Sequence, residues 1–167
     1  MENFIFFNFY ICNIKCVLMI SKSCKYAIRA SVFVASKANE NIKLSMKEIA
    51  EEIEAPAAFT GKILQILNKH KIITSLKGPY GGFFCEKYQL DFPILGIVNA
   101  IDGLSVFREC VMGLHQCSDE HPCPMHFEYS KIRALMLKSF QETTIGSLAE
   151  KLSGGESYLT NAKWLKE

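Results

Sequence analysis

Three cysteines, Cys110, Cys117 and Cys123, lie within one short stretch of the chain. Other side chains that bind metals lie in or beside this stretch: His115, His121, His126, Glu109, Asp119 and Glu120. Thiolates are soft ligands that suit zinc, copper(I) and iron–sulfur clusters. Three thiolates from one loop leave a coordination position for a further group, so this stretch predicts a metal site.

The chain has 167 residues and seven cysteines, and no secretion signal accompanies them. Residues 1–18 are apolar, but they lack a basic start and a small-residue cleavage site, and asparagines interrupt them. They therefore suit neither a signal peptide nor a membrane span. We interpret them as a leader outside the fold, with Met19 as the natural start. An anchor that touches a membrane is the alternative. Without such an anchor, the protein is expected in the cytoplasm, where metal binding or thiol chemistry outranks structural disulfides.

Positive charge is concentrated in the first part of the chain, although the net charge is only +2. Residues 19–90 contain 11 lysines and arginines against 6 acids, whereas residues 91–167 contain 7 against 10. Between Ala55 and Tyr80 there are four lysines and no acid. This asymmetry predicts a basic binding face on the first part of the chain.

Three helices are predicted before residue 71 from the spacing of apolar side chains. The first covers residues 21–37 and the third covers residues 57–70. The second begins at a capping box, in which Ser45 and Glu48 satisfy each other's end of the helix. A tight turn joins the second helix to the third, which is the arrangement of a helix-turn-helix whose second helix enters the major groove of DNA.

A β-hairpin is predicted next, with strand-like residues 72–76 and 83–88 on either side of a glycine-rich turn. Three helices followed by a hairpin with a basic tip form the order of a winged helix-turn-helix. Lysines on the third helix and at the hairpin tip favour phosphate contacts, and a few polar side chains remain to read bases. The predicted DNA-binding residues are Thr60, Lys62, Gln65, Lys69, Lys77 and Tyr80.

A helix over residues 91–102, capped by Asp91, is predicted before the cysteine loop, and a long helix over residues 125–143 after it. The long helix carries more apolar surface than a helix facing water would, which predicts that a second copy of the chain covers it. The expected fold is mainly α with a small β-hairpin. The predicted divisions are the leader (1–18), a winged helix-turn-helix domain (19–90), a supporting helix (91–107), a cysteine loop (108–124), a dimerisation helix with a short terminal helix (125–152) and a polar tail (153–167).

A resemblance to a known family rests on residues 22–29, 47–51, 77–83 and 97–103 and on the three spaced cysteines. In this order they resemble the Rrf-type winged-helix transcription regulators, a bacterial family that includes the iron–sulfur cluster regulator (IscR) and the nitric-oxide-sensitive repressor (NsrR). The resemblance covers about residues 19–150. It implies a DNA-binding regulator rather than an enzyme, and a homodimer, joined by the long helix, on a roughly palindromic operator. It implies no membrane and no small-molecule substrate.

The resemblance also implies an iron–sulfur cluster on the three cysteines, 2Fe–2S in preference to 4Fe–4S, whose state changes operator affinity in response to nitric oxide, redox state or iron–sulfur status. His126 stands three residues after the last cysteine, where the iron–sulfur cluster regulator has its fourth ligand. Nitric-oxide sensors of the family use an aspartate at the position that Lys25 occupies here. We therefore favour His126 as the fourth ligand. The alternatives are Cys24, Glu109 and His121.

Zinc and a metal-free thiol switch are the alternatives to a cluster. Structural zinc sites usually contain two cysteines separated by roughly two to four residues, whereas here the intervals contain six and five residues. The spacing therefore favours the cluster. An enzyme with Cys117 as nucleophile and His115 or His121 as base is not supported, because the sequence shows no activated-nucleophile motif.

Overall fold

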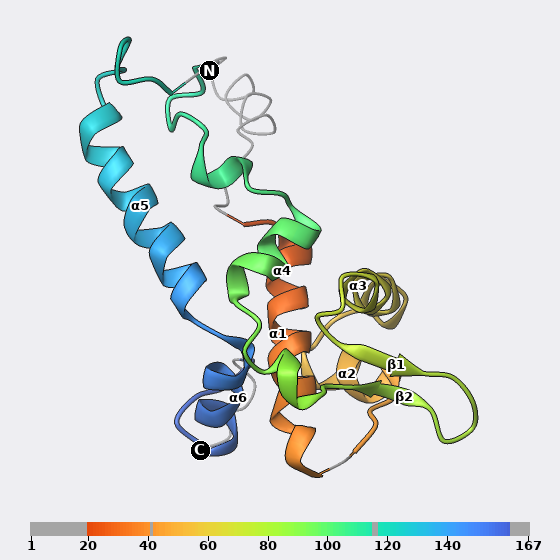
Figure 1. Cartoon of the computed structure of the whole chain (residues 1–167). Helices are drawn as coiled ribbons and strands as arrows, with labels where there is room; N and C mark the ends of the chain where they lie inside the picture. The colour runs from red at the N-terminus through yellow and green to blue at the C-terminus, as the bar shows by residue number, and fades with distance from the viewer. Residues whose placement is uncertain (1–19, 41, 115–116, 161–167) are drawn as a thin grey trace, which may run out of the picture.

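The computed structural model describes residues 20–40, 42–114 and 117–160, so the predicted leader over residues 1–18 lies outside the described residues. Figure 1 shows the order of the elements: α1 (Lys22–Ser36), η3 (Ala38–Glu40), α2 (Met46–Glu52), α3 (Ala57–Lys69), β1 (Thr74–Leu76), β2 (Gly82–Phe84), η4 (Lys87–Gln89), α4 (Ile94–Ile101), η5 (Ser105–Phe107), α5 (His126–Glu142) and α6 (Ile145–Ser153). The mainly α fold with a small hairpin, expected from the sequence, is confirmed. Among these helices none is both long and apolar enough to cross a bilayer.

Side-chain caps fix where the first two helices begin. Ser21 caps α1 by accepting a hydrogen bond from the backbone N–H of Cys24. Asp102, at the end of α4, accepts further bonds of 2.7 and 2.6 Å from the backbone N–H and the hydroxyl of Ser21. The predicted capping box of Ser45 and Glu48 is present at the start of α2. The caps therefore fix α1 against α4 and set the start of the helix-turn-helix.

One hydrophobic core joins the helix-turn-helix to the last helix. Ile49 and Ile53 from the second helix region, Leu64 from α3 and Ile145 from α6 are fully buried in it. Helix α6 packs on α1, so residues that follow the long helix complete the winged-helix unit (Figure 1).

The wing consists of β1 and β2, which pair in antiparallel register, and one further bridge. Leu44, just before α2, exchanges two backbone hydrogen bonds with Phe83, at 2.9 and 2.8 Å. Gly82 lies against this bridge with a φ of +156°, and a Cβ there would come 2.8 Å from the carbonyl oxygen of Leu44. A glycine is therefore required where the hairpin approaches the segment before α2.

The second strand is shorter than the sequence indicated. Strand β2 ends at Phe84, and the chain turns into η4 instead of continuing to residue 88. Gln89 is buried, and its side chain accepts from the N–H of Glu86 at 2.8 Å and donates to the carbonyl of Lys71 at 2.9 Å. A buried amide must be hydrogen-bonded, and these bonds turn the chain away from the strand direction.

Helix α4 also begins later than predicted. Asp91 does not cap it: the helix starts at Ile94 after Pro93, without a side-chain cap. Proline has a fixed φ that suits the start of a helix, and the free N–H of Ile94 donates to the carbonyl of Thr143 at 2.9 Å. The backbone carbonyl of Thr143, just after α5, therefore takes the place of Asp91 as an acceptor at the start of α4.

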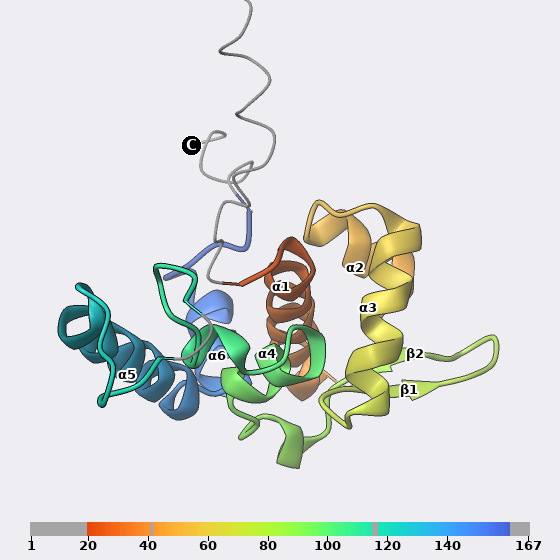
Figure 2. The same ribbon diagram turned by 90° about the horizontal axis from the view of Figure 1, so that it is seen from above.

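Helix α5 lies on the opposite side of α1 and α4 from α3 and the wing (Figures 1 and 2). Near its C-terminal end, Met136 and Phe140 pack on the cluster around Phe107. On the rest of the helix Leu135 is 69% exposed and Phe127 is 61% exposed. An apolar helix surface of this kind usually lies against a partner.

Candidate metal centre and nucleic-acid interface

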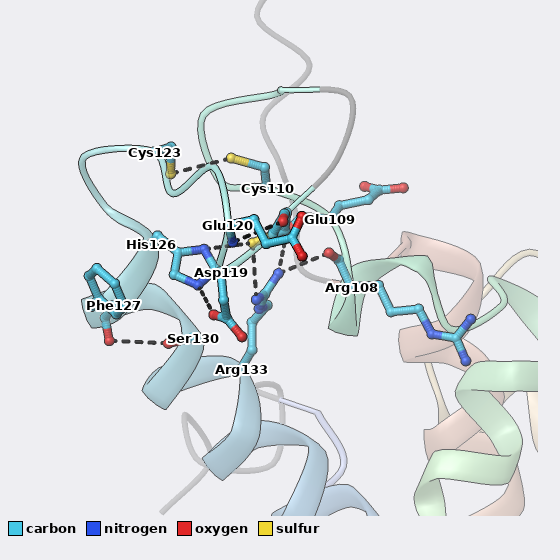
Figure 3. Close-up of polar contacts among 12 residues, drawn as sticks. Arg108, Glu109, Cys110, Asp119, Glu120, Cys123, His126, Phe127, Ser130 and Arg133 are labelled. Atoms are coloured by element: carbon cyan, nitrogen blue, oxygen red, sulfur yellow. Dashed lines mark hydrogen bonds and ion pairs between the residues drawn. The ribbon is translucent and has the colours of Figure 1, made fainter.

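The loop between η5 and α5 brings two pairs of metal-binding atoms together (Figure 3). The Sγ atoms of Cys110 and Cys123 are 3.5 Å apart, and Sγ of Cys117 is 3.2 Å from Nδ1 of His126. His126 is the first residue of α5, so the helix fixes one donor and the loop supplies the other three. The three predicted cysteines and the favoured fourth ligand therefore form two close pairs.

His126 is held by the groups around it. Only 4% of the residue is exposed, and its Nε2 lies 2.6 Å from Oδ1 of Asp119. The ring of Phe127 packs edge-on against the imidazole, with the centroids 5.1 Å apart. Carboxylates commonly hold one nitrogen of a ligating histidine in this way and orient the other towards the metal. Here the oriented atom is Nδ1, which faces the sulfur of Cys117.

The pairwise arrangement bears on which metal group the side chains fit. Within the described ranges, no three histidine, cysteine or carboxylate side chains are grouped so that they could hold a single metal ion. Structural zinc needs four ligands around one point. A two-iron cluster divides its four ligands into one pair on each iron. Three sulfurs and one imidazole nitrogen, grouped two by two, are donor types that such a cluster accepts.

The thiols of Cys110 and Cys123 differ in acidity. Hydrogen bonds from the backbone N–H groups of Leu114 and Met112 lower the pKa of Cys110. Burial raises the pKa of Cys123, and its hydrogen bond to Cys110 raises it further. Cys110 therefore loses its proton before Cys123 does.

Arg133, on α5, connects the helix to both sides of the loop. Its Nη1 donates to the carbonyl oxygens of Arg108 and Glu109, each at 2.9 Å, and its Nη2 donates to Sγ of Cys117 at 3.2 Å. The guanidinium also lies over the ring of Tyr129, at 5.5 Å from the centroid. One side chain thus contacts the start of the loop and the middle cysteine.

The alternative fourth ligands have different surroundings. Cys24 is fully buried beside Val98 and Phe107, and burial together with the nearby charge of Asp102 raises the pKa of its thiol to about 12. This disfavours the thiolate that metal binding needs. The side chains of Glu109 and His121 are exposed. His115 lies outside the described residues.

Helix α3 presents a polar face to solvent. Lys62, Gln65 and Lys69 are exposed at a spacing of three and four residues, so they lie along one side of the helix. Thr60, also predicted to contact DNA, is instead fully buried, and its hydroxyl donates to the carbonyl of Pro56 at 3.1 Å. The exposed polar surface of α3 therefore includes the two lysines and the glutamine.

The tip of the wing carries the other two predicted DNA contacts. Lys77 is exposed at the start of the turn, and Tyr80 is 88% exposed within it. Neither Lys77 nor the two lysines on α3 form an ion pair within the part of the chain that the structure describes. Their charges are therefore free to contact phosphates.

Sequence reasoning missed two residues of the metal centre. Asp119 was noted as a carboxylate but had no role, and Arg133 was not singled out. A signal for the arginine exists: it follows His126 by seven residues, two helical turns on, and so lies on the same face of α5. No comparable spacing rule identifies Asp119, because a loop places it.

Comparisons with known proteins identify the family and the fold of the chain. A model of the Rrf2 family, described as iron-dependent transcriptional regulators, matches residues 20–151. An HTH-type transcriptional regulator of Aquifex aeolicus is 27% identical over 133 residues, which cover 78% of this chain and 91% of the relative. Among solved structures, IscR of T. potens matches with a TM-score of 0.64 and 15% identity, over 89% of this chain and 98% of that protein. CymR, the global cysteine regulator of B. subtilis, matches with a TM-score of 0.62 and 22% identity, over 78% of this chain and 95% of CymR.

The family match spans the winged helix, the cysteine loop and α5, which are the parts that carry the exposed lysines of α3 and the wing and the two pairs of candidate ligands. The family consists of transcriptional regulators and not of enzymes. The chain therefore belongs to the Rrf2 family of winged-helix transcriptional regulators.

Proposed function

We propose that the protein is a homodimeric DNA-binding regulator whose operator affinity depends on an iron–sulfur cluster held by Cys110, Cys117, Cys123 and His126. The observation that carries the proposal is the convergence of these four side chains into two donor pairs. The family's description as iron-dependent supports it independently. The preferred cluster is 2Fe–2S, since each pair supplies the two ligands of one iron.

The place of the loop in the fold gives the cluster a way to act on DNA binding. The loop joins η5, which packs on the winged-helix unit, to α5. When bound, the cluster would be the group that responds to the signal. Nitric oxide, a change in redox state or a shortage of iron and sulfur would oxidise or remove it. The ligating residues fix the loop against the first turn of α5, and release of their sulfur atoms frees it. The angle between α5 and α3, the helix that would contact DNA bases, then changes.

The exposed apolar side chains of α5 support a second copy as the partner. Phe127, Ile132 and Leu135 are each more than half exposed, which is unusual for large apolar side chains on one helix. A two-fold pair would set two α3 helices on successive major grooves, about 34–36 Å apart. In each half-site Gln65 reads bases, while Lys62, Lys69 and Lys77 contact phosphates, with Tyr80 at the tip of the wing.

Cys117→Ala tests whether cluster binding controls operator affinity, because it removes the sulfur of the pair that Cys117 forms with His126. We expect the variant to lose its visible absorption and to bind operator DNA as cluster-free wild type does. Cys85→Ala is the control: Cys85 is a free thiol like Cys117, but it is buried in the main core, away from the loop. Wild type that binds the operator equally with and without its cluster would reject the proposal.

A metal-free thiol switch is a second candidate, which the separation of Cys110 and Cys123 favours. Their sulfurs are 3.5 Å apart, and a disulfide needs about 2.05 Å, so a small movement of the loop would suffice. Hydrogen peroxide would oxidise both thiols, forming one S–S bond, while the peroxide is reduced to two waters. Mass spectrometry of metal-free protein tests this: a loss of two hydrogens between these cysteines, with a parallel change in DNA affinity, supports the switch.

A further inference from the structure

The metal centre contains one side chain that is not a ligand but contacts both the loop and a proposed ligand. Arg133 donates to the carbonyl oxygens of Arg108 and Glu109 and to the sulfur of Cys117 (Figure 3). The two carbonyls lie directly after η5, which packs on α1 and α4 of the winged-helix unit. The sulfur belongs to Cys117, in the middle of the loop. The arginine itself is anchored on α5.

Because of these three contacts, the positions of α5, of Cys117 and of the two residues after η5 depend on one another. A guanidinium is planar and rigid, so its N–H donors keep a fixed geometry relative to one another. The ring of Tyr129 lies over it and restricts its orientation. A shift of the Cys117 sulfur therefore moves the guanidinium, and with it either the two carbonyls or the turn of α5 that carries Arg133.

We propose that Arg133 is the positioning residue that transmits the state of the cysteine loop to α5 and to the end of the winged-helix unit. The inference rests on the proposed function, because it concerns what happens when the cluster binds or leaves. Ligation holds Cys117 where the arginine can contact the sulfur and both carbonyls together. Loss of ligation releases the sulfur, and the link between η5 and α5 loosens.

Two substitutions of Arg133 separate this role from that of a simple surface charge. Arg133→Gln removes the charge and the fork of donors, whereas Arg133→Lys keeps the charge and loses the fork. Arg108→Gln is the matched control, because only the backbone of Arg108 takes part and its side chain points away from the donor pairs in Figure 3. The control removes a positive charge near the loop without touching the link.

The measurement is the Kd for operator DNA of cluster-loaded and cluster-free protein, with iron per chain determined for every sample. Allosteric couplings typically change affinity by about 5- to 150-fold. We expect a ratio in this range for wild type and Arg108→Gln, and a ratio near 1 for both Arg133 variants at full iron loading. In cluster-loaded protein, hydrogen exchange of the loop should rise in Arg133→Gln and stay unchanged in Arg108→Gln.

The outcomes distinguish this inference from the proposed function. If both Arg133 variants keep the wild-type ratio, Arg133 does not transmit the signal, although cluster control itself stands. If the Arg133→Lys protein binds no iron, the residue builds the ligand set, and the coupling role is overturned. A wild-type ratio of 1 would overturn the proposed function and this inference together.

Discussion

Lys77→Ala tests the assignment of the wing to the DNA backbone. Lys77 is exposed at the tip of the hairpin and forms no ion pair among the described residues. Each phosphate contact contributes about 0.9 to the slope of log K against log salt concentration, so a dimer that loses two contacts loses about 1.8. Between 50 and 200 mM salt, wild-type affinity should therefore fall roughly 12-fold more than the affinity of the variant.

The assay is fluorescence anisotropy with operator DNA and with an unrelated duplex, at four or more salt concentrations. We expect the variant to bind both duplexes more weakly and by a similar factor, because a phosphate contact carries no sequence information. Lys151→Ala, on the exposed surface of α6, is the control and should leave the slope unchanged. A variant with the wild-type slope, or with altered base preference, would refute the assignment.

Three further predictions concern α3, the core and the capping box. Gln65→Ala should cost about 1–3 kcal/mol of binding to the operator and relax the preference at the bases it reads, as measured by competition with single-base variants of the site; equal loss on all duplexes would assign Gln65 to the backbone. Leu64→Ala removes a fully buried side chain and should lower the free energy of unfolding by about 2–5 kcal/mol in urea titrations, whereas a change within error would show that the core there is loosely packed. Hydrogen bonds from Ser45 lower the pKa of Glu48 from its usual 4.5, so the carboxylate stabilises the fold above that pH and this contribution is lost as the pH falls through the lowered value. Glu48→Gln should therefore lose less stability than wild type in thermal unfolding between about pH 5 and pH 3, and parallel losses would contradict the sign.

Local signals predicted most of the helices correctly. Ser45 and Glu48 form a capping box because both partners lie within one turn, and the sequence alone identifies such a pair. The predicted end of β2 and the predicted start of α4 were wrong, because hydrogen bonds to residues far along the chain determine both. Gln89 bonds to Lys71, and the N–H of Ile94 bonds to the chain after α5.

The metal centre divides in the same way. The spacing of the three cysteines and of His126 matches the pattern of a known family, so the sequence alone could propose them as donors. Asp119 and Arg133 depend on how the loop folds back on α5, which no local pattern encodes. Thr60 shows the converse: its place in a helix was predicted correctly, but the predicted contact with DNA was wrong, because the side chain is buried.

Iron and acid-labile sulfide in protein purified without oxygen test the central claim most directly. The donor pairs predict about two irons and two sulfides per chain, with broad visible absorption that disappears in Cys117→Ala. Colourless wild-type protein with neither iron nor sulfide, or with stoichiometric zinc instead, would contradict the claim.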